Sequence, residues 1–277
     1  MPQPARRYAG SMKPFPAPLP ARVAMCRSLD HPNDKLVETI LAAEAARQNG
    51  ARSISLIAPY LCYMRQDIAF NPGEAVSQQI VGGWLADRFD AVVTVDPHLH
   101  RVATLAEAVP AASAVALSAA ALFGAYLQER EPDALLVGPD EESAQWLAAA
   151  TRGHPFETAV CRKLRRGDRD VAIDIPNVTL AGRPVVLVDD MASTGATLAV
   201  AARRCLERGA ATVDVLVVHG LFVGDAVADL RRAGVRRVWS TDSVLHPTNA
   251  LPLAPLLASA IPGPGASGIV GSQGGTR

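Results

Sequence analysis

Short runs of apolar, often β-branched residues alternate along the chain with longer segments whose apolar positions recur at helical spacing. A run with no polar face suits a strand that is buried on both sides of a parallel sheet. Helices are expected between the strands, with Gly50 and Gly209 at two of their ends. This alternation predicts an α/β fold with mainly parallel sheets flanked by helices. The strands are predicted at 21–26, 53–58, 91–95, 134–137, 156–160, 171–175, 184–188, 212–219 and 237–240.

An internal repetition organises these elements into two units. Gly50-Ala51 and the strand after it resemble Gly209-Ala210 and the strand that follows there. The second half has more elements ahead of its central strand, so the first unit is predicted to be N-terminally truncated and stabilised by the other unit or by oligomerisation. The predicted parts are an irregular proline-rich arm (1–20), a first unit (21–114), a second unit (115–261) and a disordered tail (262–277).

Composition narrows the classes of function. Lys plus Arg equals Asp plus Glu, 27 of each, so the chain carries no global basic field and nucleic acid is not an expected partner. The apolar stretch 108–127 contains Pro110 and Gly124 and is predicted to form a strand and a helix, not a membrane span. No signal-peptide core is found at the start. The four scattered cysteines favour buried, reduced thiols and a cytoplasmic location.

The central candidate site lies between residues 184 and 200. Asp189 and Asp190 follow the buried run, and small and hydroxylated residues then lead into a helix. Such a loop directs backbone N–H groups and the positive end of the helix dipole at one place, which suits a phosphate. Paired acids beside it can hydrogen-bond sugar hydroxyls. The pattern therefore predicts a phosphorylated-sugar site, with phosphate contacts from Ser193, Thr194, Gly195, Ala196 and Thr197; an ordinary crossover with capping acids is the structural alternative.

This stretch resembles the phosphoribosyl pyrophosphate signature of the type I phosphoribosyltransferase fold. Further segments resemble one family with that fold, phosphoribosyl pyrophosphate synthetase (ribose-phosphate diphosphokinase), over roughly 28–261. The amino-acid sequence of residues 71–75 is more similar to the archaeal-like branch of this family than to the common bacterial one. The segments that carry the resemblance are Tyr63-Met64-Arg65-Gln66-Asp67, Asp96-Pro97-His98, Gly138-Pro139-Asp140 and Lys163-Leu164-Arg165.

The resemblance implies a role for each segment. Arg65, Gln66, Asp67 and His98 would bind ATP. Asp140 would join Asp189, Asp190 and residues 193–197 at ribose 5-phosphate. Lys163 and Arg165 would act in catalysis from a charged loop at 162–170. Mg²⁺ would be held near His98, Asp96 and Asp140, and the chain would form a homo-oligomer. Taken singly, each of these residues also has an ordinary structural explanation. Arg65 and Asp67 suit a surface ion pair, and His98 suits a solvated loop residue. Asp140 suits a helix cap, and Lys163 and Arg165 suit a solvated basic loop.

The implied reaction transfers the pyrophosphoryl group of ATP to the 1-hydroxyl of ribose 5-phosphate, giving 5-phosphoribosyl 1-pyrophosphate and AMP. The family's Phe-x-Asp-Gly-Glu hairpin, which packs on adenine, is not found ahead of the strand at 21–26. Two other functions therefore stay open: a non-catalytic regulatory homologue of the synthetase, and a phosphoribosyltransferase that consumes the activated sugar.

Overall fold

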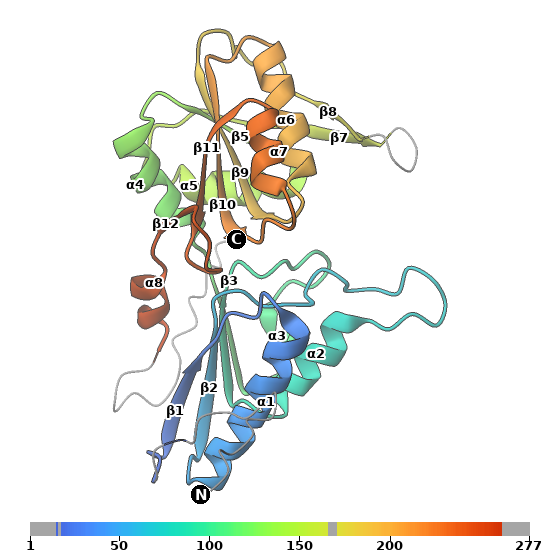
Figure 1. Cartoon of the computed structure of the whole chain (residues 1–277), viewed down its shortest axis with the longest axis vertical. Helices are drawn as coiled ribbons and strands as arrows, with labels where there is room; N and C mark the ends of the chain where they lie inside the picture. Colours follow the sequence, from blue (N-terminus) through green and yellow to red (C-terminus); the bar gives the residue numbers. More distant parts are fainter. Residues whose placement is uncertain (1–14, 16–17, 166–170, 262–277) are drawn as a thin grey trace, which may run out of the picture. The chain divides into compact units, whose positions relative to one another are not determined.

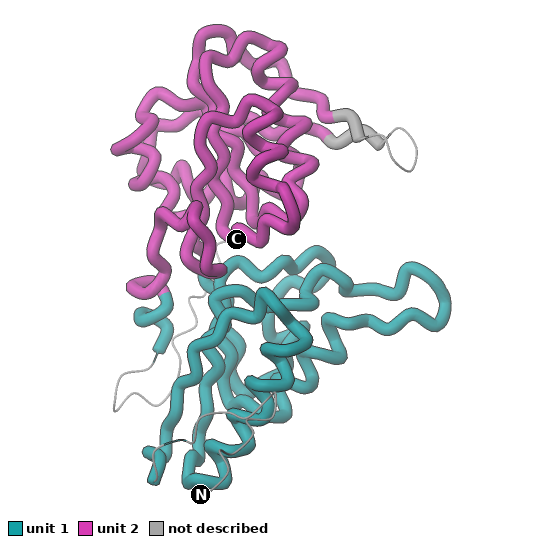
Figure 2. Tube along the Cα trace, in the orientation of Figure 1, with its two compact units in different colours: residues 1–117, 257–277 teal, residues 118–256 magenta. Residues whose placement is uncertain are grey.

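The computed structural model describes residue 15, residues 18–165 and residues 171–261. These residues form two compact units, one made by the described residues up to 117 together with 257–261 and the other by the described residues of 118–256 (Figure 2). The sequence-based boundary after residue 114 falls inside a strand of the first unit, so the observed boundary lies three residues later. Residues 257–261, which were predicted to belong to the second unit, group with the first.

The first unit is built on a four-stranded sheet in the order β1-β2-β3-β4, with every neighbouring pair parallel (Figure 1). Right-handed crossovers between strands in sequential order place the connecting helices on one face. Leu36, Val81 and Leu105, one from each helix, belong to the same buried cluster as Ile54 and Val92 of the sheet. The elements are β1 (Arg22–Cys26), α1 (Pro32–Gln48), β2 (Ser53–Ala58), α2 (Ser77–Ala86), β3 (Ala91–Val95), α3 (Leu105–Ala108) and β4 (Ser113–Leu117).

The second unit has a six-stranded parallel sheet in the order β12-β11-β10-β9-β5-β6. Helices α6 and α7 lie on one face and α4 and α5 on the other (Figure 1). The elements are α4 (Ala120–Arg130), β5 (Leu135–Gly138), the 3₁₀ turn η1 (Glu141–Ser143), α5 (Ala144–Ala150), β6 (Thr158–Val160), β7 (Arg162–Arg165), β8 (Val171–Asp174), β9 (Pro184–Ala192), α6 (Ala196–Glu207), β10 (Thr212–Gly220), α7 (Ala226–Arg232), β11 (Val235–Thr241), β12 (Asn249–Leu251) and α8 (Ala254–Ser259).

The predicted repetition is present in the helix ends. In the first unit the N–H of Ala51 donates to the carbonyl of Ala46 at 3.0 Å, and Gly50 has a φ of 102°. In the second, the N–H of Ala210 donates to the carbonyl of Cys205 at 3.1 Å, and Gly209 has a φ of 87°. Both helices therefore end in the same left-handed glycine turn and lead into a central parallel strand.

The two sheets differ at one edge. In the second unit β9 is an interior strand, and the sheet continues from it to β5 and β6. Among the described residues of the first unit, β1 pairs with β2 alone, and Arg22, Ala24 and Cys26 are exposed. Cys26 is therefore an exposed thiol, contrary to the prediction that the cysteines are buried, whereas Cys62, Cys161 and Cys205 are buried and free.

The first helix of the first unit begins at Pro32 after His31, because proline suits the first helical position. One local prediction was wrong. The predicted charged loop at 162–170 begins as a strand: β7 pairs antiparallel with β8, Arg162 opposite Asp174. Across the described residues, no helix combines the length and apolar character that crossing a membrane requires.

Candidate functional site

Asp189 and Asp190 lie on β9, between β5 and β10 in the sheet. Val185 to Val188 are completely buried, as the apolar run predicted. The strand was predicted to end at residue 188, but it continues past both acids, and Ala192 still pairs with Gly220. Asp189 is half-buried and Asp190 is 4% exposed, and the N–H of Asp190 donates to Oδ1 of Asp189 at 3.0 Å.

The loop from Ser193 to Gly195 joins this strand to α6. Gly195 is the N-cap and has a φ of 72°, a left-handed conformation that a side chain would strain. Its carbonyl accepts the N–H of Ala199 at 2.8 Å, which starts the helical ladder. The N–H groups of the first turn have no partners within the helix and point out of its positive end. Ala196 has a helical backbone, so its methyl group is compatible with this turn.

Asp140 reaches the same edge of the sheet from β5. Val137 of β5 pairs with Leu187 of β9, so the chain beyond each strand emerges at the shared carboxyl edge. There Oδ1 of Asp140 accepts the N–H of Glu142 at 3.2 Å and caps the 3₁₀ turn. A Cβ on Gly138 would lie 2.1 Å from Oγ of Ser143, so the tight turn at this point requires glycine. The capping role that the sequence suggested for Asp140 is confirmed.

The three carboxylates interact electrostatically. Burial raises the pKa of Asp189 well above its ordinary value, and the neighbouring charges of Asp190 and Asp140 raise it further. The protein alone therefore holds this group in an unfavourable environment for its charged form. A ligand that offers hydroxyl donors or a cation at this edge would relieve that cost.

The loop after β10 supports the loop that begins at Ser193, a feature that sequence analysis missed. The N–H of Phe222 donates to the carbonyl of Ala192 at 3.0 Å, and the N–H of Val223 donates to that of Ser193 at the same distance. Phe222 has a φ of 38°, an uncommon conformation for a residue with a side chain. The only sequence signal was Gly220, since a Cβ there would lie 2.5 Å from the Phe222 ring.

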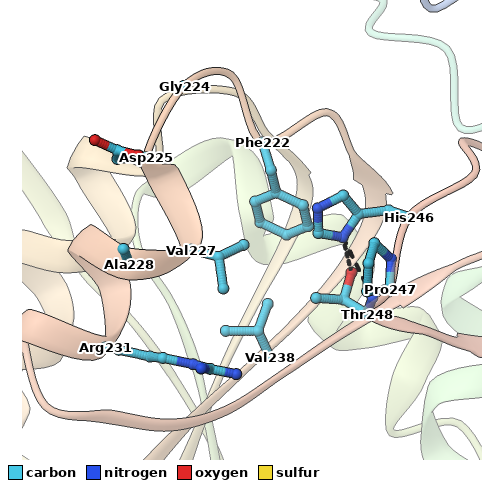
Figure 3. Close-up of a pocket in the computed structure, with 10 residues that line it drawn as sticks. All are labelled: Phe222, Gly224, Asp225, Val227, Ala228, Arg231, Val238, His246, Pro247 and Thr248. Atoms are coloured by element: carbon cyan, nitrogen blue, oxygen red, sulfur yellow. Dashed lines mark hydrogen bonds between the residues drawn. The ribbon is translucent and has the colours of Figure 1, made fainter.

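A cavity of about 480 Å³ lies beside this loop (Figure 3). The Phe222 ring forms one wall, 4.7 Å between centroids from the ring of His246. Nδ1 of His246 contacts the hydroxyl of Thr248 at 2.9 Å. No predicted site residue lines this cavity.

The candidate ATP residues of the first unit come from two segments. Arg65 is exposed, and Oε1 of Gln66 accepts a hydrogen bond from Ser77 at 2.7 Å. The side chain of Asp67 is completely buried and paired with Arg101. Asp67 is thus held within the protein, in contrast to Arg65.

The second segment follows β3. Asp96 is 9% exposed and has a φ of 36°, and its N–H donates to the carbonyl of Leu117 at 2.8 Å. His98 is half-buried two residues later. Backbone strain of this kind concentrates at functional sites. In the described residues no three His, Cys, Asp or Glu side chains form a metal-binding group.

Lys163 and Arg165 are on β7, opposite Ile173 and Val171 of β8. Their side chains, and residues 166–170 of the predicted catalytic loop, lie outside what the structure describes. The antiparallel ribbon follows β6 directly, and β6 is paired with β5 of the second unit.

Comparison with known proteins covers both units. Residues 21–87 match the N-terminal domain of ribose phosphate pyrophosphokinase, and residues 106–241 match the phosphoribosyl transferase domain. The ribose-phosphate pyrophosphokinase of Methanopyrus kandleri is 36% identical over 89% of this chain and 84% of its own length. The chain belongs to the ribose-phosphate pyrophosphokinase family.

Two further proteins of this pyrophosphokinase family are also similar to the chain. The enzyme of that name from Halobacterium salinarum strain R1 is 34% identical, over 83% of this chain and 80% of its own length. The crystal structure of phosphoribosylpyrophosphate synthetase from Mycobacterium smegmatis superposes with a TM-score of 0.71 at 25% identity, covering 86% of this chain and 80% of that one. The predicted resemblance to this family, and to its archaeal members, is confirmed.

Proposed function

We propose that this chain is a ribose-phosphate pyrophosphokinase that transfers the pyrophosphoryl group of ATP to the 1-hydroxyl of ribose 5-phosphate. The products are 5-phosphoribosyl 1-pyrophosphate and AMP. The observation that carries the proposal is the acid pair of β9 followed by a left-handed glycine at the start of α6, in a chain whose two halves match this family.

The sugar end of the reaction is assigned to the second unit. Asp189 and Asp190 accept hydrogen bonds from the ribose hydroxyls, and Asp140 lies at the same edge. The N–H groups and hydroxyls of Ser193 to Thr197 bind the 5-phosphate at the positive end of α6. The raised pKa of Asp189 supports this assignment, since hydroxyl donors stabilise the carboxylate that the protein alone disfavours.

The nucleotide end is assigned to the segments that carry Arg65, Gln66 and Asp67 and to His98. The exposed guanidinium of Arg65 is available to a ligand, and the Gln66 amide is oriented by its bond to Ser77. These residues bind ATP, whose β-phosphorus is attacked by the ribose 1-hydroxyl. The new bond joins the ribose oxygen to the β-phosphorus, and the bond to the bridging oxygen breaks as AMP leaves.

Lys163 and Arg165 are assigned to charge stabilisation during the transfer. Negative charge spreads over the oxygens of the transferred group, so catalysis depends on positioning and on fixed positive charge. The planar fork of Arg165 suits two phosphate oxygens at once, and Lys163 supplies a compact point charge. The β7–β8 ribbon provides a defined backbone for both residues.

The donor groups present suit Mg²⁺, an ion that needs few protein ligands. Mg²⁺ retains several waters and uses one or two carboxylates together with substrate phosphates, so a dense group of protein ligands is not required. Asp96 and His98 would hold it in the first unit, and Asp140 is the candidate in the second. When bound, the ion supplies charge neutralisation of the phosphate oxygens.

A homo-oligomer is part of the same proposal. The position of β1 at the end of the strand order among the described residues supports it, because a strand at a sheet edge can pair with another chain. Light scattering of the purified protein tests it directly: a mass equal to one 29.1 kDa chain would contradict it.

The reaction is tested by incubating the protein with ATP, ribose 5-phosphate and MgCl₂ and following AMP by chromatography. The expected result is AMP formation that requires the sugar phosphate and falls at least 100-fold in Lys163→Ala/Arg165→Ala, roughly the loss seen when a charge-stabilising donor is removed. Unchanged AMP formation in that variant would remove the assignment. Calorimetric titration with ATP distinguishes the synthetase from both alternatives: a phosphoribosyltransferase would show no ATP-specific binding, and a regulatory homologue would show weak binding or none.

A further inference from the structure

The segment that carries Arg65 is held on one side by the first turn of α2. Nε2 of Gln78 donates to the carbonyl of Met64 at 2.9 Å, and the N–H of Gln78 donates to the carbonyl of Gln66 at 3.1 Å. Oγ of Ser77 donates to the side-chain oxygen of Gln66 at 2.7 Å. The residues on both sides of Arg65 are therefore fixed to α2, whereas Arg65 itself is exposed.

Asp67 holds the other side of this segment to the loop after β3. Oδ1 of Asp67 accepts Nη1 of Arg101 at 2.6 Å, and Oδ2 accepts the backbone N–H of the same Arg101 at 3.0 Å. Nδ1 of His100 lies 4.0 Å from Oδ2. Both carboxylate oxygens are thus occupied by a residue 34 positions further along the chain, three residues after His98.

The environment of Asp67 separates its role from that of Arg65. Its side chain is completely buried, and a buried carboxylate is costly unless it is paired and hydrogen-bonded. Arg101 supplies both the charge and a backbone donor. Because the side chain is completely buried in these contacts, the carboxylate is not available to a nucleotide, and its effect on one is exerted through the segments that it joins.

We propose that Asp67 and Arg101 form a positioning pair that holds the loop carrying Asp96 and His98 against the segment carrying Arg65. This inference rests on the proposed function, since it takes Arg65 and His98 as the residues that face ATP. Asp67 then acts as a positioning residue and not as a contact with adenine. The pair joins two segments that follow neighbouring parallel strands, β2 and β3, and so sets the geometry of the nucleotide end.

The test compares Asp67→Asn and Arg101→Ala with the unaltered full chain. Each variant is expected to raise the KM for ATP about tenfold, the effect typical of a residue that orients another, with an unchanged KM for ribose 5-phosphate. The double variant is expected to be no worse than either single one, because each change breaks the same pair. Hydrogen exchange followed by mass spectrometry is expected to show faster exchange in peptides covering 97–104, a readout that does not depend on activity.

A matched control is present in the same unit. Arg47 and Asp90 also form an ion pair, 2.8 Å between Nη2 and Oδ2, but Asp90 precedes β3 and so lies at the opposite end of that strand from His98. Arg47→Ala is expected to lower the melting temperature without changing the KM for ATP. Arg101→Lys, which keeps the charge, is expected to recover part of the ATP affinity, and it replaces Arg101→Ala if that variant does not fold.

Two results would overturn the proposal. If Asp67→Asn weakens ATP binding while Arg101→Ala leaves it unchanged, Asp67 contacts the nucleotide directly. If neither variant changes the KM for ATP or the exchange of 97–104, the pair has no positioning role. Failure of the proposed function is distinguishable, because the unaltered chain would then form no AMP, whereas the exchange experiment would still report whether the pair holds the loop.

Discussion

The backbone N–H of Phe222 donates to the carbonyl of Ala192 at 3.0 Å, which ties the loop after β10 to the residue that precedes the loop from Ser193 to Gly195. The Phe222 ring fits because position 220 is glycine: a Cβ there would lie 2.5 Å from the ring and 3.1 Å from Cβ of Ser240. The geometry of the proposed phosphate site therefore depends on a glycine in a neighbouring strand.

Gly220→Ala is accordingly expected to displace Phe222 and disturb residues 192 and 193. Crowding of a packed site by one methyl group costs about 1–3 kcal/mol. We expect the KM for ribose 5-phosphate to rise on the order of tenfold, since small misplacements of a binding loop are costly. Steady-state kinetics with varied sugar phosphate measure this. Gly220→Ala/Phe222→Leu, which removes the obstructing ring edge, should recover affinity; equal KM values in Gly220→Ala and the unaltered protein would contradict the idea.

Asp189→Asn is expected to stabilise the fold and weaken the proposed function together. The folded-state pKa of Asp189 is raised, so the native state binds its proton more tightly than the unfolded state does. That preference favours folding at low pH and is lost as the pH rises from the unfolded pKa through the folded one. At neutral pH the neutral amide should therefore raise the melting temperature, by about 2–4 °C.

The stabilisation from Asp189→Asn should shrink as the pH falls toward the ordinary aspartate pKa, because the native carboxyl is by then protonated. Scanning calorimetry between pH 4 and 8, in the absence of ligand, measures it. Affinity for ribose 5-phosphate should fall in the same variant. A melting temperature that drops at neutral pH would show that the carboxylate is not held unfavourably.

Arg236→Ala is expected to destabilise the second unit. Nε of Arg236 donates to Oδ1 of Asp214 at 3.0 Å, and its Nη2 contacts both Asp214 and Glu131. The Asp214 side chain is 1% exposed, so removing its partner leaves a buried charge uncompensated. Allowing for the partial exposure of Arg236, we expect a loss of roughly 2–4 kcal/mol in the free energy of unfolding, measured in urea. Arg204→Ala breaks an exposed pair with Glu207 and should cost less than about 1 kcal/mol.

Two adjacent glycines of α2 provide a test of packing in the first unit. A Cβ on Gly82 would lie 1.7 Å from the carbonyl oxygen of Ala108, whereas one on Gly83 would meet nothing within 4 Å. Gly82→Ala should force α2 and α3 apart at a cost of about 1–3 kcal/mol. Gly83→Ala should stabilise the protein by about 0.5–1 kcal/mol, because alanine loses less backbone entropy in a helix. Similar melting temperatures for the two variants would show that the helices are not in close contact.

The local amino-acid sequence determined several structural features of this protein. The run from Val185 to Val188, the glycine ends at Gly50 and Gly209 and the acid pair before a small-residue loop each depend on neighbouring residues, and each lies where the sequence predicted it. The family followed from five such segments in order, and the comparisons confirm it.

The tertiary structure decided what depends on pairing between distant residues. β9 extends past Asp189 because β10 continues to offer partners as far as Gly220, and the charged stretch from Arg162 becomes a strand because β8 returns beside it. Three further features also depend on residues far apart in the sequence. They are the pairing of the buried Asp67 with Arg101, the hydrogen bond from Phe222 to Ala192, and the exposure of Cys26 at a sheet edge. Hydrophobic periodicity reports which face of an element is buried, but hydrogen-bond and charge partners many residues apart are chosen only when the chain has folded.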